Sequence, residues 1–407
     1  MDTILIVGGR VETIAKAKEL GLRVVFVQHR DRMLPGHVEL ADALLMVDYR
    51  DWEIARPLVE AAYEVYKFTK VVSLGEQAME AVGRINDHFG LGGTSFEVSA
   101  RFRDKLAMRR HLAELGVPSV AAADVTGPDD IEEFGGQYGY PVVLKPIDNT
   151  ASRGVVVIER AEDVLGSWDF ASGLRDREDL VLGQFFPVGR FLVEEYIPGP
   201  EYSVETFSFA GRHSVVSITE KYTDGVVEDA HALPARLTAE SEAEVCRYIR
   251  RFLSAMGLQD GVAHTEIKIS PSGPRVIESH DRLAGERIPD LVLNAYEIDL
   301  ERYAVAAPFG LLPELPDRPV ALRGAATRHL SVEPGVVTGI SGVEAVRDHP
   351  DLISLHISVK PGDRVVTVVD NFDHSGQVLA TGVDTAAAAK TADALAAMVT
   401  VCTEPSA

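Results

Sequence analysis

One hairpin pattern narrows the possible folds of this chain more than any other feature. A turn at residues 271–273, which ends in glycine, separates two strand-type segments. A three-residue hairpin loop with glycine last pairs Ser270 with Pro274 and sets Glu266 opposite Glu278. Side chains of directly opposed residues share a face of the sheet, about 5 Å apart. Two such carboxylates repel each other unless a divalent cation lies between them, so the pattern predicts a metal site.

His280 and Arg282 follow this hairpin closely. His280 lies two residues beyond Glu278, so its side chain shares the same face and can supply a third metal ligand or a supporting contact. A metal that is held by two carboxylates and bridges triphosphate oxygens, with a guanidinium nearby, suits phosphoryl transfer. A register slipped by one residue would put the glutamates on opposite faces, and that alternative stays open.

A second pattern places a lysine beside a short polar turn. An apolar strand ends at Lys145, residues 149–154 read Asn-Thr-Ala-Ser-Arg-Gly, and another apolar strand covers residues 155–158. Such a turn can direct backbone N–H groups and hydroxyls at phosphates, while the lysine neutralises their charge. An ordinary surface hairpin with an exposed lysine is the alternative. The candidate phosphate-binding residues are Lys145, Thr150, Ser152 and Gly154.

A third pattern carries acids on both sides of a turn. An apolar strand runs into Glu194 and Glu195, a Pro-Gly-Pro turn follows, and Glu201 begins the next strand. In a cleft, Glu194 can accept a hydrogen bond from an adenine amino group, and Glu201 can bind ribose hydroxyls. The backbone at Tyr196 and Ile197 can pair with the ring edge. Glu195 is interpreted as facing solvent.

The N-terminal part of the chain predicts a parallel α/β unit. An apolar run at residues 3–9 ends in two glycines, a helix-type stretch covers 11–20, and a strand covers 23–27. A dinucleotide site is disfavoured, because the glycines do not complete the GxGxxG fingerprint and a His-Arg pair follows the second strand where an acid is expected. A structural lobe that closes over another site is the favoured interpretation.

Charge and cysteine content narrow the classes of partner. The net charge of −22 and the lack of any Lys/Arg-rich block argue against nucleic acid or a membrane surface, because both require a positive face. No run of about 18 apolar residues is present that could span a bilayer. Cys246 and Cys402 lie far apart without a partner motif, so neither a disulfide framework nor a zinc site is supported. A cytoplasmic location is expected.

Taken in order along the chain, these patterns resemble those of the ATP-grasp superfamily. The resemblance implies a multidomain α/β and α+β chain: a Rossmann-like domain at 1–102, a two-lobed ATP-grasp domain at 103–312 and a biotin-carboxylase-like C-terminal domain at 313–407. It implies ATP and Mg²⁺ as cofactors, with Mn²⁺ as an alternative to Mg²⁺. The positions that correspond to the family's nucleotide and metal residues are Lys105, Lys145, residues 150–154, Glu194, Glu201, Glu266 and Glu278.

The chain departs from the family pattern at one position. The family usually reads Glu-x-Asn-x-Arg where this chain has His280 in place of the asparagine. Imidazole is a poorer magnesium ligand than oxygen, so His280 is expected to orient substrate or to act with manganese.

Within the superfamily, residues 281–289 are most similar to amino-acid ligases, a group that includes bacterial L-amino acid ligases, dapdiamide-type synthetases and carnosine synthase. This implies a ligase that joins a small carboxylate, such as an amino acid, to an amine through an acyl phosphate, with release of ADP and phosphate. Lys145 and Arg282 would be catalytic. The candidate substrate residues are Lys221, Glu228, His231, Arg282, Gly285, Glu286 and Arg287.

Two other functions would use the same nucleotide site. One is a carboxylase or formyl-transfer ligase of purine or biotin type, which the lack of a biotin-carrier segment disfavours. The other is a non-catalytic ATP-binding protein, which is expected to lack the metal acids or phosphate lysines that this chain retains. The resemblance also allows a homodimer.

Overall fold

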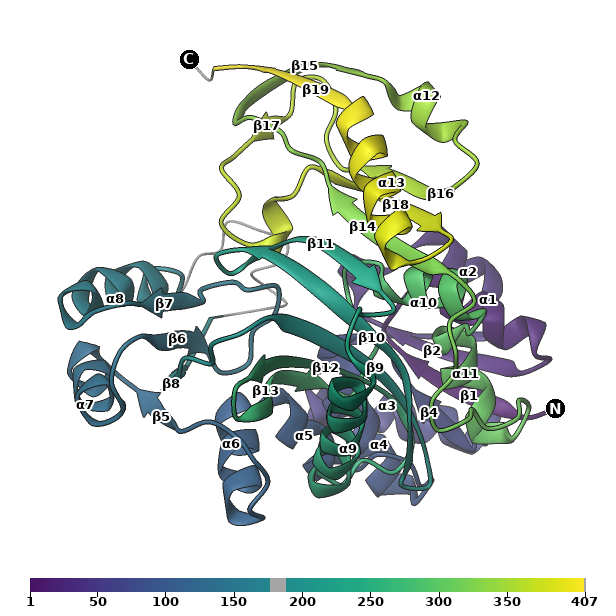
Figure 1. Cartoon of the computed structure of the whole chain (residues 1–407). Helices are drawn as coiled ribbons and strands as arrows, with labels where there is room; N and C mark the ends of the chain where they lie inside the picture. Colours follow the sequence, from purple (N-terminus) through teal and green to yellow (C-terminus); the bar gives the residue numbers. More distant parts are fainter. Residues whose placement is uncertain (176–187, 406–407) are drawn as a thin grey trace.

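A computed structural model describes residues 1–175 and 188–405 of the chain (Figure 1). The N-terminal unit consists of strands β1 (Thr3–Val7), β2 (Arg23–Gln28), β3 (Ala43–Met46) and β4 (Lys70–Val72), with helices α1 (Val11–Glu19), α2 (Pro35–Leu40), α3 (Trp52–Tyr66) and α4 (Met79–Phe89). Its sheet is parallel, in the order β3-β2-β1-β4. The α/β unit predicted from the sequence is therefore present.

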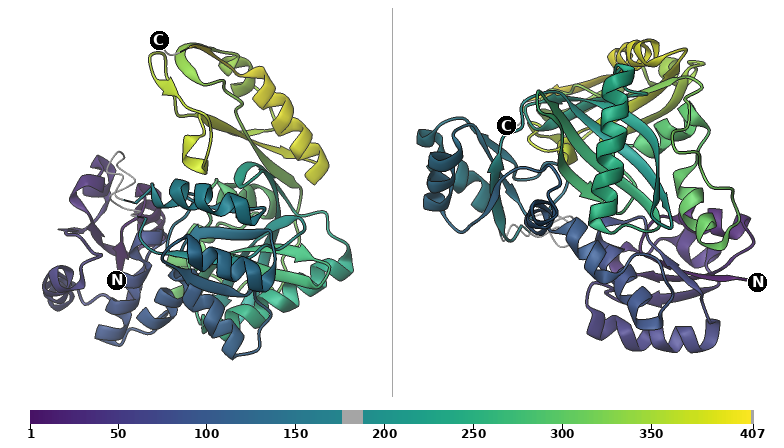
Figure 2. Two further views of the ribbon diagram at one scale, coloured as in Figure 1. Left: turned by 90° about the vertical axis from the view of Figure 1, so that its left-hand side faces the viewer. Right: turned by 60° about the horizontal axis from the view of Figure 1, so that its bottom comes forward.

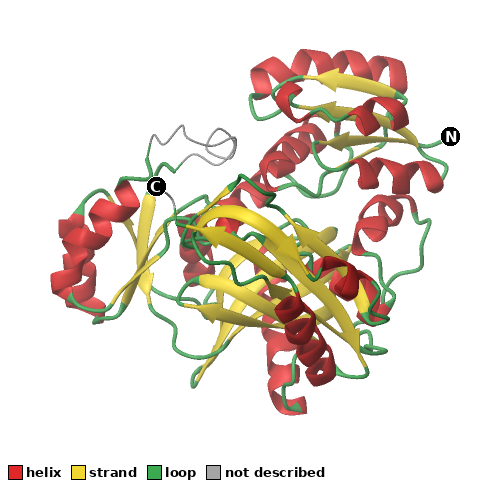
Figure 3. Cartoon of the chain, turned by 90° about the horizontal axis from the view of Figure 1, so that it is seen from above, coloured by secondary structure: helices red, strands yellow, loops and turns green. Residues whose placement is uncertain are grey.

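Both faces of this parallel sheet are covered by helices (Figure 3). Leu5 and Val7 pack with α3 and α4, whereas Ile4 and Ile6 pack with α1 and with Val305 of α11 (Leu300–Ala306). Burial on both faces explains why β1 is apolar throughout instead of alternating. Because α11 belongs to a later part of the chain, its contact with α1 fixes the N-terminal unit against the rest of the molecule.

A small four-stranded lobe follows and stands to one side of the molecule (Figure 2). Helices α5 (Phe96–Arg103) and α6 (Lys105–Glu114) lead into it. Its elements are β5 (Ala122–Val125), α7 (Pro128–Tyr138), β6 (Val142–Pro146), β7 (Val156–Ile158), α8 (Val164–Ser172) and β8 (Phe191–Glu195). The strands pair antiparallel in the order β5-β8-β6-β7, so the predicted hairpin after Lys145 joins β6 to β7.

An eight-stranded antiparallel sheet forms the centre of the molecule. Its strands are β9 (Glu201–Phe209), β10 (Arg212–Asp224), β11 (Val227–Leu233), β12 (Gly261–Ser270), β13 (Gly273–His280), β14 (Gly324–His329), β16 (Leu352–Ile357) and β18 (Gly376–Gly382). One face packs on α9 (Ala239–Met256) through residues such as Val215, and the other packs on α10 (Ile288–Tyr296) and α11 through residues such as Val216.

The C-terminal region continues this central sheet. β14 pairs with β11, which extends the sheet through β18 to β16. The remaining elements are α12 (Val343–Arg347), α13 (Thr385–Met398) and a three-stranded sheet of β17 (Arg364–Val365), β15 (Gly335–Ser341) and β19 (Thr400–Glu404). Asp384 caps α13 by accepting a hydrogen bond from the N–H of Ala387. None of the helices in the described residues is long and apolar enough to cross a membrane.

Candidate active site

The β12–β13 hairpin places Glu266 opposite Glu278, as predicted, although its tip differs from the prediction. Ser270 pairs with Gly273 and not with Pro274, so the loop contains two residues instead of three. The prediction of a three-residue loop was wrong, because a tighter turn is stabilised here. The Ser270 hydroxyl donates a 2.9 Å hydrogen bond to the Gly273 carbonyl, and Gly273 adopts a positive φ of 94°. If the two-residue loop were the only difference from the prediction, every later pair in the hairpin would be shifted by one residue.

A β-bulge at Ile277 restores the register. Val276 pairs with Ile267, the next pair is Glu278 with Glu266, and Ile277 has no partner across the ladder. The carbonyl that the bulge frees is used: the Arg109 guanidinium donates to it at 2.5 Å and the Lys145 ammonium at 3.2 Å. The same irregularity that aligns the two glutamates therefore also anchors two cations beside them.

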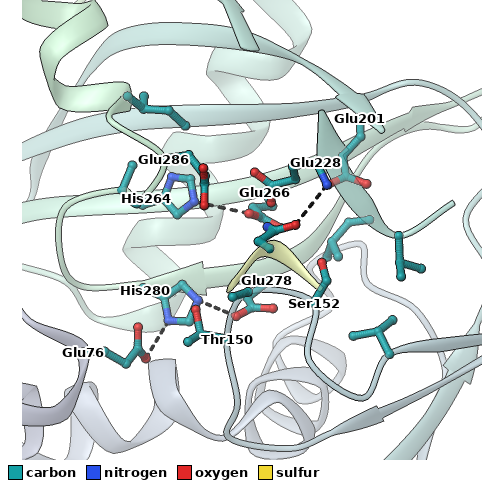
Figure 4. A pocket seen from close by; sticks show the side chains of 18 of the residues that line it. Glu76, Thr150, Ser152, Glu201, Glu228, His264, Glu266, Glu278, His280 and Glu286 are labelled. Atoms are coloured by element: carbon teal, nitrogen blue, oxygen red, sulfur yellow. Dashed lines mark hydrogen bonds and ion pairs between the residues drawn. The ribbon is translucent and has the colours of Figure 1, made fainter. Parts of the chain in front are cut away.

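A single cavity of about 710 Å³ gathers most of the candidate residues (Figure 4). The predicted residues that line it are Lys145, Thr150, Ser152, Glu194, Tyr196, Ile197, Glu201, Glu228, Glu266, Glu278, His280, Arg282, Gly285, Glu286 and Arg287. Lys105 stands directly behind the wall, with its Nζ 3.1 Å from Glu278, and His231 does so with its Nε2 2.8 Å from Glu228. Gly154, which belongs to the loop that joins β6 to β7, does not line the cavity.

The N-terminal unit contributes to the same cavity. Gly9 and Arg10, which follow β1, line it together with Glu76 of the short helix η2 (Glu76–Ala78). The βα turn after β1, whose glycines do not complete a dinucleotide fingerprint, therefore lies in the wall of this cavity.

Lys145 and Glu194 form a buried ion pair at one side of the cavity. Their charged groups are 2.5 Å apart, and Arg109 lies 3.1 Å from the other carboxylate oxygen of Glu194. Burial would raise the pKa of Glu194, but Arg109 and Lys145 outweigh it and lower the pKa. Burial lowers the pKa of Lys145, and Glu194 opposes that shift. Glu194 is therefore an ionised acceptor that two cations already hold, and no local pattern in the sequence marked Arg109 as one of them.

Glu195 is not simply a solvent-facing residue, contrary to the interpretation from its sequence position. Its carboxylate accepts a 2.7 Å hydrogen bond from the N–H of Ala121, and it also lines the cavity. This hydrogen bond joins the last residue of β8 to the residue that precedes β5.

Lys221 is the centre of a second charge cluster. Its ammonium lies 2.8 Å from Glu201, 3.0 Å from Glu228 and 2.8 Å from Glu266. Burial would lower the pKa of Lys221, but the three carboxylates hold it well above its usual value. Lys221 therefore brings together three glutamates with different predicted roles: Glu201 for ribose, Glu228 for substrate and Glu266 for the metal.

His280 lies between two carboxylates rather than free in the cavity (Figure 4). Its Nε2 is 2.5 Å from Glu278, and its Nδ1 is 2.9 Å from Glu76. Glu76 also accepts a 2.5 Å hydrogen bond from Nε of Arg282. Burial would raise the pKa of Glu76, but Arg282 and His280 hold it well below its usual range. Glu76 was missed by sequence reasoning, because nothing near it in the chain marks it as a site residue.

The donor set at Glu266 and Glu278 suits a hard divalent cation. Among residues 1–175 and 188–405, no group of three or more His, Cys, Asp or Glu side chains is arranged to hold a metal. Magnesium, however, commonly binds through one or two carboxylates and completes its shell with phosphates and water. Two glutamates in a cavity that also contains Thr150 and Ser152 fit that chemistry. His280 fits it poorly as a third ligand, since both of its nitrogens lie against carboxylates.

Three family models match the chain in succession. They are the ATP-grasp N-terminal domain at residues 14–93, the ATP-grasp domain at 138–290 and the L-amino acid ligase C-terminal domain 2 at 328–404. The cavity described above is lined by residues from all three matched regions, including Asn371 and Phe372 from the third, and by Gly9, Arg10 and Thr13, which precede the first match.

Relatives of this chain include named ligases. An uncharacterised protein of Sinorhizobium fredii, y4rH, is 29% identical over 313 residues, which cover 76% of this chain and 63% of the relative. The alanine–anticapsin ligase of Bacillus subtilis is 26% identical over 281 residues, which cover 65% of this chain and 59% of that enzyme. The chain thus spans less than two thirds of the length of either relative.

The crystal structure of an L-amino acid ligase from Bacillus licheniformis has the same fold. It superposes with a TM-score of 0.83 and 20% sequence identity, and the alignment covers 99% of both chains. The ATP-grasp fold expected from the sequence is confirmed. The three family models and the shared fold therefore show that the chain is built from ATP-grasp domains, followed by a domain of the L-amino acid ligase C-terminal type.

Proposed function

We propose that the protein is an ATP-dependent ligase that joins a carboxylate, in the first instance an amino acid, to an amine. The observation that supports this most strongly is that one cavity contains Lys145, the paired glutamates Glu266 and Glu278, and Arg282. These are the groups needed to neutralise a triphosphate and a developing acyl phosphate. The named ligases among its relatives support the same conclusion.

In this proposal the nucleotide lies between the small lobe and the central sheet. Tyr196 and Ile197 offer backbone groups to adenine, and Glu201 faces the ribose. Lys105, Lys145 and the loop that contains Thr150, Ser152 and Gly154 hold the phosphates. Glu266 and Glu278 hold Mg²⁺, which, when bound, supplies positive charge that offsets the charge on the phosphate oxygens. Glu194 keeps Lys145 in place through their ion pair.

Two displacements complete the proposed reaction. A carboxylate oxygen of the donor attacks the γ-phosphorus, the bond from that phosphorus to the β-phosphate oxygen breaks, and ADP leaves. The amine nitrogen then attacks the acyl carbon, the carbon–oxygen bond to phosphate breaks, and the amine loses a proton. Arg282 stabilises the negative charge on the acyl phosphate and on the tetrahedral intermediate. Glu76 fixes the orientation of Arg282 through their hydrogen bond.

The substrate end of the cavity is assigned to residues 282–287 together with the acids of β11. Glu286 and Arg287 both adopt positive φ, 46° and 60°, although neither is glycine. Non-glycine residues in this conformation are uncommon, and they concentrate at binding sites where the surrounding structure holds them. We assign Gly285, Glu286 and Arg287 to this end of the cavity, together with Glu228 and His231 of β11.

Incubation of the purified protein with ATP, MgCl₂ and a panel of amino acids tests the proposal. Phosphate release together with an amide product in the mass spectrum is the expected outcome. Glu278→Gln should lower kcat at least about a hundredfold, because one charge of the metal site is lost. Glu64→Gln is the matched control, since the Glu64 side chain is 75% exposed and pairs with Lys67 on the surface.

Two results would count against the assignment. If Glu278→Gln turned over at the wild-type rate, Glu278 would not be a metal ligand. Phosphate release with bicarbonate or formate, but with no amino acid, would move the protein to the carboxylase or formyl-transfer class instead.

A further inference from the structure

The phosphate loop between β6 and β7 contains two consecutive residues in a costly conformation. Ala151 and Ser152 have φ values of 60° and 59°. The left-handed region is unfavourable for residues with a Cβ atom, so such a pair persists only where neighbouring structure holds it. Inside the loop, the hydrogen bonds from Arg153 N to Thr150 O and from Val155 N to Ser152 O contribute.

The C-terminal region supplies a contact from outside the loop. The backbone N–H of Asn371, the first residue of the short helix η5 (Asn371–Asp373), donates a 3.2 Å hydrogen bond to the Ala151 carbonyl. Asn371 is buried, with 8% of its surface exposed, and it lines the same cavity as the phosphate loop. A residue far along the sequence thus holds the carbonyl of a strained loop residue.

The side chain of Asn371 reaches a second part of the site. Its Oδ1 accepts a 3.0 Å hydrogen bond from the N–H of Glu228 on β11. Nε2 of His374, three residues later, lies 2.8 Å from the carbonyl oxygen of Glu228. The peptide groups on both sides of Glu228 are therefore held by the C-terminal segment, in addition to the ladder that joins β11 to β14.

A charge interaction joins the same two segments. Asp370 precedes Asn371, and Arg153 belongs to the phosphate loop. Burial, together with Asp373, raises the pKa of Asp370, and the Arg153 guanidinium opposes that rise. Attraction between Asp370 and Arg153 therefore acts in the same direction as the hydrogen bond to Ala151.

We infer that Asn371 is a positioning residue that holds the phosphate loop and Glu228 in one fixed arrangement. It acts through the Ala151 carbonyl at the phosphate end of the cavity and through the Glu228 backbone at the substrate end. The C-terminal region thereby takes part in forming the ATP site. The inference rests on the proposed function in one respect, namely that the loop at 150–154 binds phosphates.

Two substitutions separate the two contacts. Asn371→Ala removes Oδ1 but keeps the backbone N–H, whereas Asn371→Pro removes both. Proline is compatible with the first position of a helix, and the preceding Asp370 is extended, with φ −145° and ψ 173°, as a residue before proline requires. Asn86→Ala is the matched control, because the Asn86 side chain donates to the Thr94 carbonyl in the N-terminal unit.

Hydrogen exchange read by mass spectrometry and titration with a non-hydrolysable ATP analogue provide the readouts. In Asn371→Ala, the Glu228 amide should exchange about fivefold faster, while the amides of residues 153 and 155 keep their wild-type rates. In Asn371→Pro, the loop amides should also exchange about fivefold faster, and the Kd for the analogue should rise by a similar factor. Asn86→Ala should alter neither region.

The inference is overturned if Asn371→Pro and Asn371→Ala give the same loop exchange and the same analogue Kd. If the proline variant does not fold, wild-type exchange at Glu228 in Asn371→Ala overturns the side-chain contact, and faster exchange there supports it. Neither readout requires turnover. A protein that binds the analogue as described but ligates nothing would contradict the proposed function and leave this inference standing.

Discussion

Replacing Lys221 by methionine removes one buried positive charge while keeping most of the side-chain volume. The ammonium lies within 3.0 Å of Glu201, Glu228 and Glu266, and only 2% of the side chain is exposed. The three carboxylates hold the pKa of Lys221 well above its usual value against the effect of burial, so the group is charged at neutral pH. The variant leaves three nearby acids without this common partner.

The expected loss of stability follows from that geometry. Removing one partner of a buried ion pair costs about 3–5 kcal/mol, because the remaining charge lacks compensation. Burial would raise the pKa of Glu266, and Lys221, assisted by His264, reverses this and lowers the pKa to about 2. A depressed pKa contributes stability that is present above the unfolded pKa and is lost as the pH falls through the folded one. The stability that Glu266 gains from Lys221 is complete above about pH 4.5 and is lost between pH 4.5 and about 2, so the deficit of Lys221→Met should be largest at neutral pH and should shrink within that window.

Calorimetry at pH 7.5 and at pH 3, which lies inside the window between 4.5 and about 2, measures both the size and the pH dependence of this deficit. The melting temperature should fall by roughly 6–20 °C at pH 7.5, given about 2–4 °C per kcal/mol for a domain of this size. Lys67→Met is the control, since Lys67 is 59% exposed and pairs with Glu64 on the surface. A melting temperature equal to that of the control, or a deficit that grows as the pH falls, would refute the reasoning.

Two other outcomes follow from the described contacts. In Gly199→Ala, the new Cβ would lie 2.3 Å from the Ile269 carbonyl oxygen, at a φ of 117°; we expect a loss of about 2 kcal/mol or more and weaker binding of an ATP analogue, and wild-type melting would contradict this. Burial lowers the pKa of His213 to about 4 from 6.5. The unfolded state therefore binds the extra proton between pH 6.5 and 4, and this residue removes up to roughly 3 kcal/mol of stability as the pH falls through that range. His213→Gln should flatten the acid side of the stability curve, and an unchanged slope would exclude the effect.

Local patterns in the sequence determined the features that depend on neighbouring residues. Alternating or continuous apolar runs predicted β1, α1 and the strands on either side of the turn at residues 149–154, because these depend on side-chain period and turn residues within a short window. The pairing of Glu266 with Glu278 was predicted too, but the loop at the tip was not. The bulge at Ile277 compensated for that error, and no local signal marked it. Resemblance to a known superfamily supplied the order of the domains and the candidate nucleotide residues.

Tertiary structure alone decided which groups meet in the cavity. Glu76 and Arg282, 206 positions apart in the chain, form a hydrogen bond because α1 and α11 fix the N-terminal unit against the central sheet. Lys221 meets Glu201 and Glu228 because β10 lies between β9 and β11 in the sheet, and it reaches Glu266 on β12, the strand beyond β9. Charge and hydrogen bonding act through space, and the partner of a buried ionic group is selected by how whole elements pack. Glu266 and Glu278, which the sequence pattern paired, are therefore one part of a charge network. The fold alone brings its other members to them.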